Sequence, residues 1–374
     1  MRCFNFYQTS ISTRGSNALP IQSQFSADYI TARERFCETA KERGWSLSSY
    51  PREGGRDEEL WTDVARIGAE SPDRRLIISS GLHGVEGYFG SAIQLQALQK
   101  LEAKKFTQSG LEVILVHALN PFGFARSRRM DQSNIDLNRN FLISGERYEG
   151  SHEFYRKLDP FLNPKSWPKL ELPAQLQAVA KAMRHGLGNL KQAVAEGQYD
   201  FPLGLFYGGS EPTETMRFFE SHILPEFQSA AAVLHLDLHS GLGKRGAFEF
   251  LLDYELAAEE RNWLNNSVNA NLPVQQLKSA YKARGSLSRW IRHQHPAAIS
   301  VCWEFGTSSS ISVLAALRAE NAAYHWGDRG SKTFQAAKQK LKEAFSPPEA
   351  SWQKTVLNSA DAVLQRIVKT WGNA

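Results

Sequence analysis

The chain has 374 residues, of which 42% are hydrophobic and 22% charged, with a formal net charge of +5 and a pI near 9.0. This composition is ordinary for a globular protein, and it excludes a disordered chain. The net charge is mild for this length and no run of five like charges occurs, so we expect no nucleic-acid partner.

The spacing of the cysteines and the length of the apolar runs indicate the cellular compartment in which the protein is expected. Cys3, Cys37 and Cys302 have no paired or metal-like spacing, which argues against a disulfide framework. We find no signal-peptide pattern at the start of the sequence and no run of eighteen apolar residues. The sequence therefore predicts a cytoplasmic protein without a membrane partner, and it does not indicate an oligomeric state.

Helical and extended patterns alternate along the chain. A helix is expected from about Ser26 to Arg43, with Ser26 as N-cap and Gly44 as the stop. A second helical pattern runs from Tyr88 to Lys104. An extended segment near Leu60–Ile67 and four apolar runs predict strands, the four being Arg75–Ser80, Leu111–His117, Ala231–Leu238 and Ala297–Trp303. Such strands, separated by helices, predict an α/β fold with a mixed, largely parallel central sheet flanked by helices.

We expect one catalytic domain, residues 1–374, with two additions to the sheet. The first is an insertion at about 142–229, with helical patterns near Leu172–Glu196 and Thr213–Phe227. The second is a helical C-terminal part at about 311–374, which ends in a helix near Ser351–Trp371.

A glycine-flanked His-x-x-Glu motif follows the Arg75–Ser80 strand. The sequence reads Gly-Leu-His83-Gly-Val-Glu86-Gly, and its glycines let the loop turn sharply and bring His83 and Glu86 to one point. An ordinary hydrogen-bonded loop histidine is the alternative. Ligands of parallel sheets bind beyond the carboxyl ends of the strands, which is where this loop is expected.

A second motif, His235-Leu-Asp237-Leu-His239, places three polar side chains on one face of a strand. His235 fits a hydrogen-bonded structural residue, whereas His239, at the strand end, is the better metal ligand. Two ligands close in sequence and a distant third are a common catalytic zinc arrangement, which leaves a fourth position for water.

Two further motifs carry a candidate catalytic base and candidate substrate-binding residues. Glu304 ends an apolar strand, where it is either a salt-bridged carboxylate or, beside a metal, a general base with a raised pKa. The string Asp136-Leu-Asn138-Arg139-Asn supplies planar donors that can grip a carboxylate, and a solvated basic loop is its alternative.

In the order and context of these motifs the chain resembles the zinc carboxypeptidase superfamily, which also contains aspartoacylase and succinylglutamate desuccinylase. It looks most like an uncharacterised bacterial branch that carries the Gly-Leu-His-Gly-Val-Glu-Gly and Asp-Leu-Asn-Arg-Asn-Phe strings. The resemblance implies the fold of that superfamily and one Zn²⁺ per chain, with His83, Glu86 and His239 as its ligands.

The resemblance also implies the other roles. Glu304 is expected as the base that takes a proton from the attacking water, and either Arg129 or Arg128 as the cation that stabilises the oxyanion. Asn138 and Arg139 would bind a substrate carboxylate. The remaining two residues have open alternatives: Asp136 either orients His83 or forms an Asx turn, and Tyr207 either lines the site or packs in the core.

The activity implied is hydrolysis of an amide bond in a small peptide or amino-acid conjugate with a free carboxylate, as in a metallocarboxypeptidase. An N-acyl amino acid deacylase is the alternative within the same superfamily. A non-catalytic peptide- or metal-binding protein is the second alternative, and the presence of Glu304 argues against it.

Overall fold

The computed structural model of the protein describes residues 24–54, 59–101, 110–167, 196–268 and 283–372. Its centre is a seven-stranded sheet with the strand order β1-β2-β4-β3-β5-β7-β6. The strands are β1 (Ser46–Arg52), β2 (Leu60–Gly68), β3 (Arg74–Ser80), β4 (Leu111–His117), β5 (Ala232–Arg245), β6 (Phe248–Leu251) and β7 (Ile299–Gly306). The four middle strands are parallel to one another, while β1, β2 and β6 pair antiparallel at the two sides. This confirms the mixed sheet with a parallel centre.

Alternate residues of the middle strands face two separate apolar layers. Leu76 and Ile78 of β3 belong to a core with Phe89 and Trp352, whereas Ile77 between them belongs to a second core with Trp290. Because side chains alternate along a strand, both faces of the sheet are covered and most residues of the middle strands are apolar.

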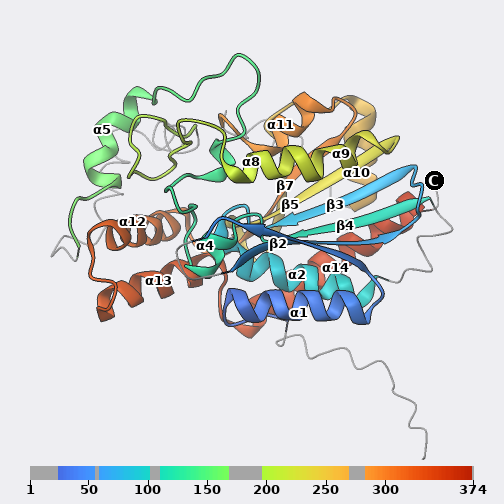
Figure 1. The fold of residues 1–374 in the computed structure, drawn as a ribbon, viewed down its shortest axis with the longest axis horizontal. Helices are drawn as coiled ribbons and strands as arrows, with labels where there is room; N and C mark the ends of the chain where they lie inside the picture. Colours follow the sequence, from blue (N-terminus) through green and yellow to red (C-terminus); the bar gives the residue numbers. More distant parts are fainter. Residues whose placement is uncertain (1–23, 55–58, 102–109, 168–195, 269–282, 373–374) are drawn as a thin grey trace, which may run out of the picture.

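Helices form these two layers (Figure 1). The first layer consists of α1 (Tyr29–Glu42), α2 (Gly87–Lys100) and α14 (Ala350–Gly372). The second layer consists of α8 (Glu214–Phe218), η4 (Phe219–Ile223), α9 (Leu224–Gln228) and α11 (Leu287–Gln294). The helix α10 (Ala258–Val268) packs against α14, and its Leu264 belongs to the first core. Three helices, α5 (Glu153–Leu162), α12 (Ser310–Trp326) and α13 (Lys332–Phe345), lie near the end of the sheet at which α4 (Pro121–Ala125) follows β4.

The expected elements form, with corrections at their ends. The N-cap of α1 is Asp28 and not Ser26, because the Asp28 carboxylate accepts a hydrogen bond from the Thr31 amide at 2.8 Å. The strand expected at Ala297–Trp303 continues through Glu304 as part of β7. The helical pattern expected at Leu172–Glu196 lies outside the described residues except for its last residue.

Two strands were not expected from the sequence. β1 has a polar, largely exposed sequence at the edge of the sheet, and β6 has only four residues. The single-domain organisation and the insertion at about 142–229 stay predictions, although α12, α13 and α14 do succeed one another in the expected helical part. Within the described ranges, we find no helix of the length and apolar character needed to cross a membrane.

Candidate metal centre

The loop after β3 places His83 and Glu86 at the carboxyl edge of the parallel strands. Gly81 takes a positive φ of 67° at the turn, and residues Gly84–Glu86 form the short helix η2. A Cβ added at Gly84 would lie 2.1 Å from the carbonyl carbon of Gly123 in α4, so only glycine allows the two loops to approach this closely. The amide of Val85 also donates to the carbonyl of Arg128 at 2.6 Å. Backbone contacts therefore fix this loop.

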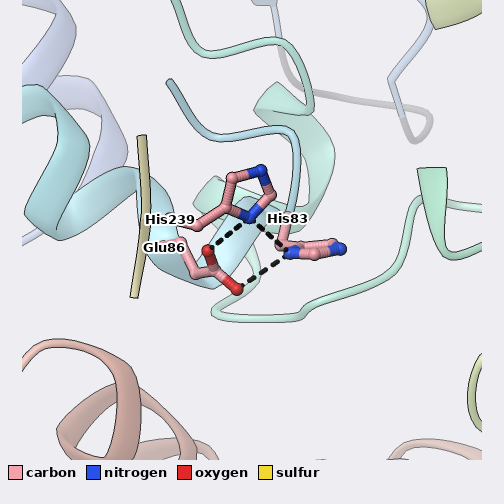
Figure 2. Close-up of side chains that lie close together, drawn as sticks. All are labelled: His83, Glu86 and His239. Atoms are coloured by element: carbon pink, nitrogen blue, oxygen red, sulfur yellow. Dashed lines mark hydrogen bonds and ion pairs between the residues drawn. The ribbon is translucent and has the colours of Figure 1, made fainter. Parts of the chain in front are cut away.

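His83, Glu86 and His239 converge on one point (Figure 2). Glu86 reaches the two rings with different oxygens: Oε1 lies 2.8 Å from Nδ1 of His83, and Oε2 lies 3.1 Å from Nδ1 of His239. The two Nδ1 atoms are 3.2 Å apart. All three side chains are at most 3% exposed.

The outer nitrogens of both rings contact carboxylates. His83 Nε2 lies 3.0 Å from Oδ1 of Asp136, and His239 Nε2 lies 2.5 Å from Oδ2 of Asp237. A neutral imidazole that donates through Nε2 has a bare lone pair on Nδ1. Two lone pairs cannot hydrogen-bond to each other, but they can bind one cation together with the Glu86 carboxylate. The chemistry of the donor set therefore fits a metal ion such as Zn²⁺.

The charges of the centre keep the buried carboxylates ionised. Burial alone would raise the pKa of Asp136, but the Arg129 guanidinium and then the His83 ring hold it well below its usual range. Burial likewise opposes the ionised form of Glu86, and His83 and His239 outweigh it and lower the pKa of that carboxyl. Both groups are negative at neutral pH.

Glu304 lies directly opposite His239 in the register of β5 and β7. One of its oxygens lies within 4.8 Å of a ring nitrogen of His239, and its Oε1 accepts a hydrogen bond from the Leu242 amide at 2.7 Å. Burial, and then repulsion from Glu86, raise the pKa of Glu304 to about 7. A carboxylate with such a pKa can accept and return a proton near neutral pH.

Cys302 is a neighbour of Glu304 on the same face of β7. His239, Cys302 and Glu304 form a second possible metal-binding group, with the Cys302 Sγ 3.8 Å from Oε2 of Glu304. The contacts among His83, Glu86 and His239 are shorter, between 2.8 and 3.2 Å, and all three side chains are buried. These three residues are therefore the stronger candidate for a metal site.

The structure separates the two arginines that the sequence left as alternatives. Arg129 Nε donates to Oδ2 of Asp136 at 2.9 Å, and its Nη1 lies 3.4 Å from Oε1 of Glu86. Arg128 lies outside this cluster: its Nε is 3.2 Å from Oε1 of Glu320, and its guanidinium carbon is 3.3 Å from the centre of the Tyr324 ring. The expectation that Arg128 could face the oxyanion is therefore corrected.

Asp136 fulfils both roles that were open for it. Its Oδ1 accepts hydrogen bonds from His83 and from the Asn138 amide, the second at 3.1 Å, as in an Asx turn. The turn begins the short helix η3 (Leu137–Arg139), so one carboxylate couples the position of His83 to the segment that carries Asn138 and Arg139.

Asn138 and Arg139 lie at the start of α11. The Oδ1 of Asn138 accepts a hydrogen bond from the Leu287 amide at 3.0 Å, which leaves Nδ2 as the donor of this half-buried side chain. Arg139 is 8% exposed, and its Nε has no hydrogen-bond partner among the described residues. We also find no ion pair of Arg139 with a carboxylate in these ranges. A buried guanidinium in this state is a candidate site for an anion.

Tyr207 packs in the core and does not support the expected substrate contact. Its side chain is 7% exposed within the apolar layer that contains Ile135 and Phe141. Its backbone carbonyl accepts a hydrogen bond from the Asp136 amide at 2.7 Å. Tyr207 therefore fixes Asp136 through its main chain, as the packing alternative allows.

Asp237 is the functional candidate that the sequence did not single out. The alternation of β5 already placed it on the face of His239, two residues before the ligand. A carboxylate at this spacing on the same strand face is the available signal for a group that orients a ligand histidine.

The fold and this cluster define an α/β protein with a candidate metal centre at the carboxyl edge of its sheet. The chain belongs to the family described as "Protein of unknown function (DUF2817)", whose model matches residues 25–359. No curated protein matches the sequence.

Several solved structures resemble this chain in fold at low sequence identity. Carboxypeptidase A from Helicoverpa armigera is 12% identical with a TM-score of 0.48, over 96% of this chain and 77% of that one. Thrombin activatable fibrinolysis inhibitor is also 12% identical with a TM-score of 0.49, over 95% and 81%. A succinylglutamate desuccinylase from Silicibacter sp. is 15% identical with a TM-score of 0.37, over 76% and 67%.

Proposed function

We propose that the protein is a zinc-dependent hydrolase of an amide bond in a small peptide or amino-acid conjugate with a free carboxylate. The observation that carries this proposal is the buried group of His83, Glu86 and His239, with Glu304 opposite His239 in the sheet. Four groups in these roles are the minimum for metal-assisted hydrolysis with a carboxylate base. A bound Zn²⁺ would supply the Lewis acid that activates water and polarises the scissile carbonyl.

The side chains of this protein perform the proton transfers and hold the charges. Glu304 removes a proton from the attacking water and returns it to the leaving amine, as its pKa of about 7 permits. Arg129 already lies beside Glu86 and Asp136, and its positive charge favours the negative oxygen that develops at the attacked carbonyl.

The substrate carboxylate would bind at Arg139 and Asn138. The Nε of Arg139, which has no hydrogen-bond partner among the described residues, and the Nδ2 of Asn138 are donors, and η3 connects both residues to Asp136. Binding here positions the scissile bond relative to the metal ligands. Both a carboxypeptidase and an N-acyl amino acid deacylase act on molecules that carry such a carboxylate, so the products must distinguish the two.

The test is product release, measured by mass spectrometry, from a pool of peptides and N-acyl amino acids incubated with zinc-loaded protein. Peptides with free and with amidated C-termini are compared. We expect the wild type to cleave only members with a free carboxylate, and Glu304→Gln to lose about 10²- to 10⁴-fold in rate while it still binds zinc. Release of a C-terminal residue identifies a peptidase, and release of the acyl group identifies a deacylase.

The matched control is Glu249→Gln. Glu249 lies opposite Glu304 on β6, so this variant removes a neighbouring carboxylate of the same type. We expect it to keep wild-type activity. If the wild type binds zinc and cleaves nothing in the pool, hydrolysis of these substrates is excluded. The result would then favour the alternative of a non-catalytic binding protein.

A further inference from the structure

A row of polar side chains crosses the sheet beneath the metal centre, on the same face as His239. Its members belong to three neighbouring strands: Ser79 of β3, His235 and Asp237 of β5, and Ser300 of β7. All four are at most 3% exposed. The rings of Phe219 and Phe227 lie against His235, so apolar side chains cover this part of the row.

The distances connect these side chains into one continuous chain. Ser300 Oγ is 2.8 Å from Nδ1 of His235, and Nε2 of His235 is 2.8 Å from Oγ of Ser79. Ser79 Oγ is in turn 2.5 Å from Oδ1 of Asp237. The other oxygen of Asp237 contacts His239 Nε2.

Chemistry determines the direction of every bond in this chain. An ionised carboxylate only accepts, so Ser79 donates its single hydroxyl proton to Asp237. Ser79 must then accept from His235, which places the His235 proton on Nε2. Burial lowers the pKa of His235 to about 4, so the ring is neutral at pH 7 and its Nδ1 accepts from Ser300.

We propose that Ser79 and His235 are positioning residues for the metal centre: they fix the Asp237 carboxylate, which holds His239 with its proton on Nε2 and its Nδ1 lone pair toward the metal. The inference rests on the proposed metal site, but it does not depend on which bond the enzyme cleaves. His83 receives the equivalent support from Asp136, whose second oxygen is held by Arg129. The two ligand histidines are thus oriented by two carboxylates, one fixed by a cation and the other by a neutral row.

The first test is zinc affinity, measured by competition with a chromogenic chelator. Asp237→Asn should weaken zinc binding about 10- to 100-fold, the range typical for loss of a carboxylate behind a ligand histidine. Ser79→Ala touches no ligand, yet it should weaken zinc binding several-fold, and Ser79→Thr, which keeps the hydroxyl, should restore it. Ser79→Ala should add little to Asp237→Asn, because both act through one carboxylate.

The matched control is Ser91→Ala. Ser91 is also buried and its hydroxyl lies 3.0 Å from Nε2 of the buried His117, but this pair is not connected to Asp237. We expect its zinc affinity to equal that of the wild type. Equal affinities for Ser79→Ala and Ser91→Ala would overturn the proposal.

A second test uses the wild-type protein alone, so it does not depend on the folding of a variant. Nitrogen-15 NMR of the imidazole rings should show His235 neutral with its proton on Nε2, and His239 with its proton on Nε2 in the zinc-loaded protein. A proton on Nδ1 of His235 would reverse the chain and overturn the proposal. These readouts need no substrate, so they stay decisive if the protein cleaves nothing.

Discussion

Arg128 and Arg129 are adjacent in the chain, but their guanidinium groups have different partners. Arg129 contacts Asp136 and Glu86 and its side chain is 12% exposed, whereas the Arg128 side chain is fully buried against Glu320. We infer that one arginine serves the reaction and the other stabilises the packing of α12 against the loop.

This division predicts different effects of two substitutions. Arg129→Ala should lower kcat/KM about 10²-fold, because it removes the cation beside the reacting oxygen, and it should also lower stability, because the buried Asp136 and Glu86 lose their guanidinium partner. Arg128→Ala should lower the free energy of unfolding by about 3 kcal/mol and leave the kcat/KM of the folded protein near the wild-type value, since it removes a fully buried side chain and one of the two cations, Arg128 and Lys338, that contact Glu320. Urea titration and steady-state kinetics of both variants check this. Equal losses of activity in two equally stable variants would contradict it.

Gly84→Ala should disturb the centre without changing any polar group. The new methyl would lie 2.1 Å from the Gly123 carbonyl carbon, so the loop that carries His83 and Glu86 must move. We expect a loss of about 1–3 kcal/mol in stability together with weaker zinc binding. Gly330→Ala is the control, because its nearest neighbour is a side-chain atom at 3.6 Å. Unchanged zinc affinity in Gly84→Ala would show that the loop tolerates the shift.

Asp136→Asn should weaken zinc binding about 10- to 100-fold, because the amide no longer holds His83 and Arg129 by charge. The rate at saturating zinc should also fall, since Arg129 loses its anchor. Asp131→Asn provides the comparison: Asp131 is a buried neighbour that accepts hydrogen bonds from the Ser133 and Ile135 amides. Isothermal titration calorimetry with zinc compares the two variants. Similar zinc affinities would show that Asp136 does not support the metal centre.

The rate should rise with pH as Glu304 loses its proton. Only the ionised Glu304 carboxylate acts as a base, and its pKa without a metal is about 7. A bound dication attracts the negative form and lowers that pKa, so about 7 is the upper bound for the midpoint of the acid limb. We expect a midpoint between about pH 5 and pH 7 in the profile of kcat/KM. An acid limb above pH 8 would point to a different base.

Stability should depend on pH through His117. Burial lowers its pKa to about 4 in the folded protein, so between that pH and about 6.5 the unfolded chain binds more protons. The stabilisation is therefore complete above about pH 6.5 and is lost as the pH falls toward 4. The loss between pH 7 and pH 5 should be on the order of 2 kcal/mol for this residue.

Denaturation of the wild type and of His117→Gln at both pH values measures this contribution as a difference. The difference is needed because Glu304, whose pKa is raised, contributes with the opposite sign. An identical pH dependence in the two proteins would show that His117 titrates normally. His293→Gln, at an exposed position, should leave the slope unchanged.

The sequence predicts best those site residues that lie at the ends of strands. His83, Glu86, His239 and Glu304 each follow or end an apolar run, and parallel strands bring their carboxyl ends to one edge, so the cluster could be expected before the structure. The choice between Arg128 and Arg129 could not be made, because it depends on Glu320 in a helix far along the chain. The role of Asp237 was missed for a similar reason, since it depends on the register of β5 with Ser79 of β3.

The metal centre also carries an electrical imbalance. Glu86, Asp136 and Asp237 are buried carboxylates within one cluster, and Arg129 is the guanidinium that contacts two of them. When the His83 and His239 rings are neutral, as metal binding requires, three negative charges against one positive charge leave a surplus that a dication would cancel. Protein produced under zinc starvation should therefore fold with lower yield and melt at a lower temperature, so the culture medium becomes a determinant of the quality of every preparation.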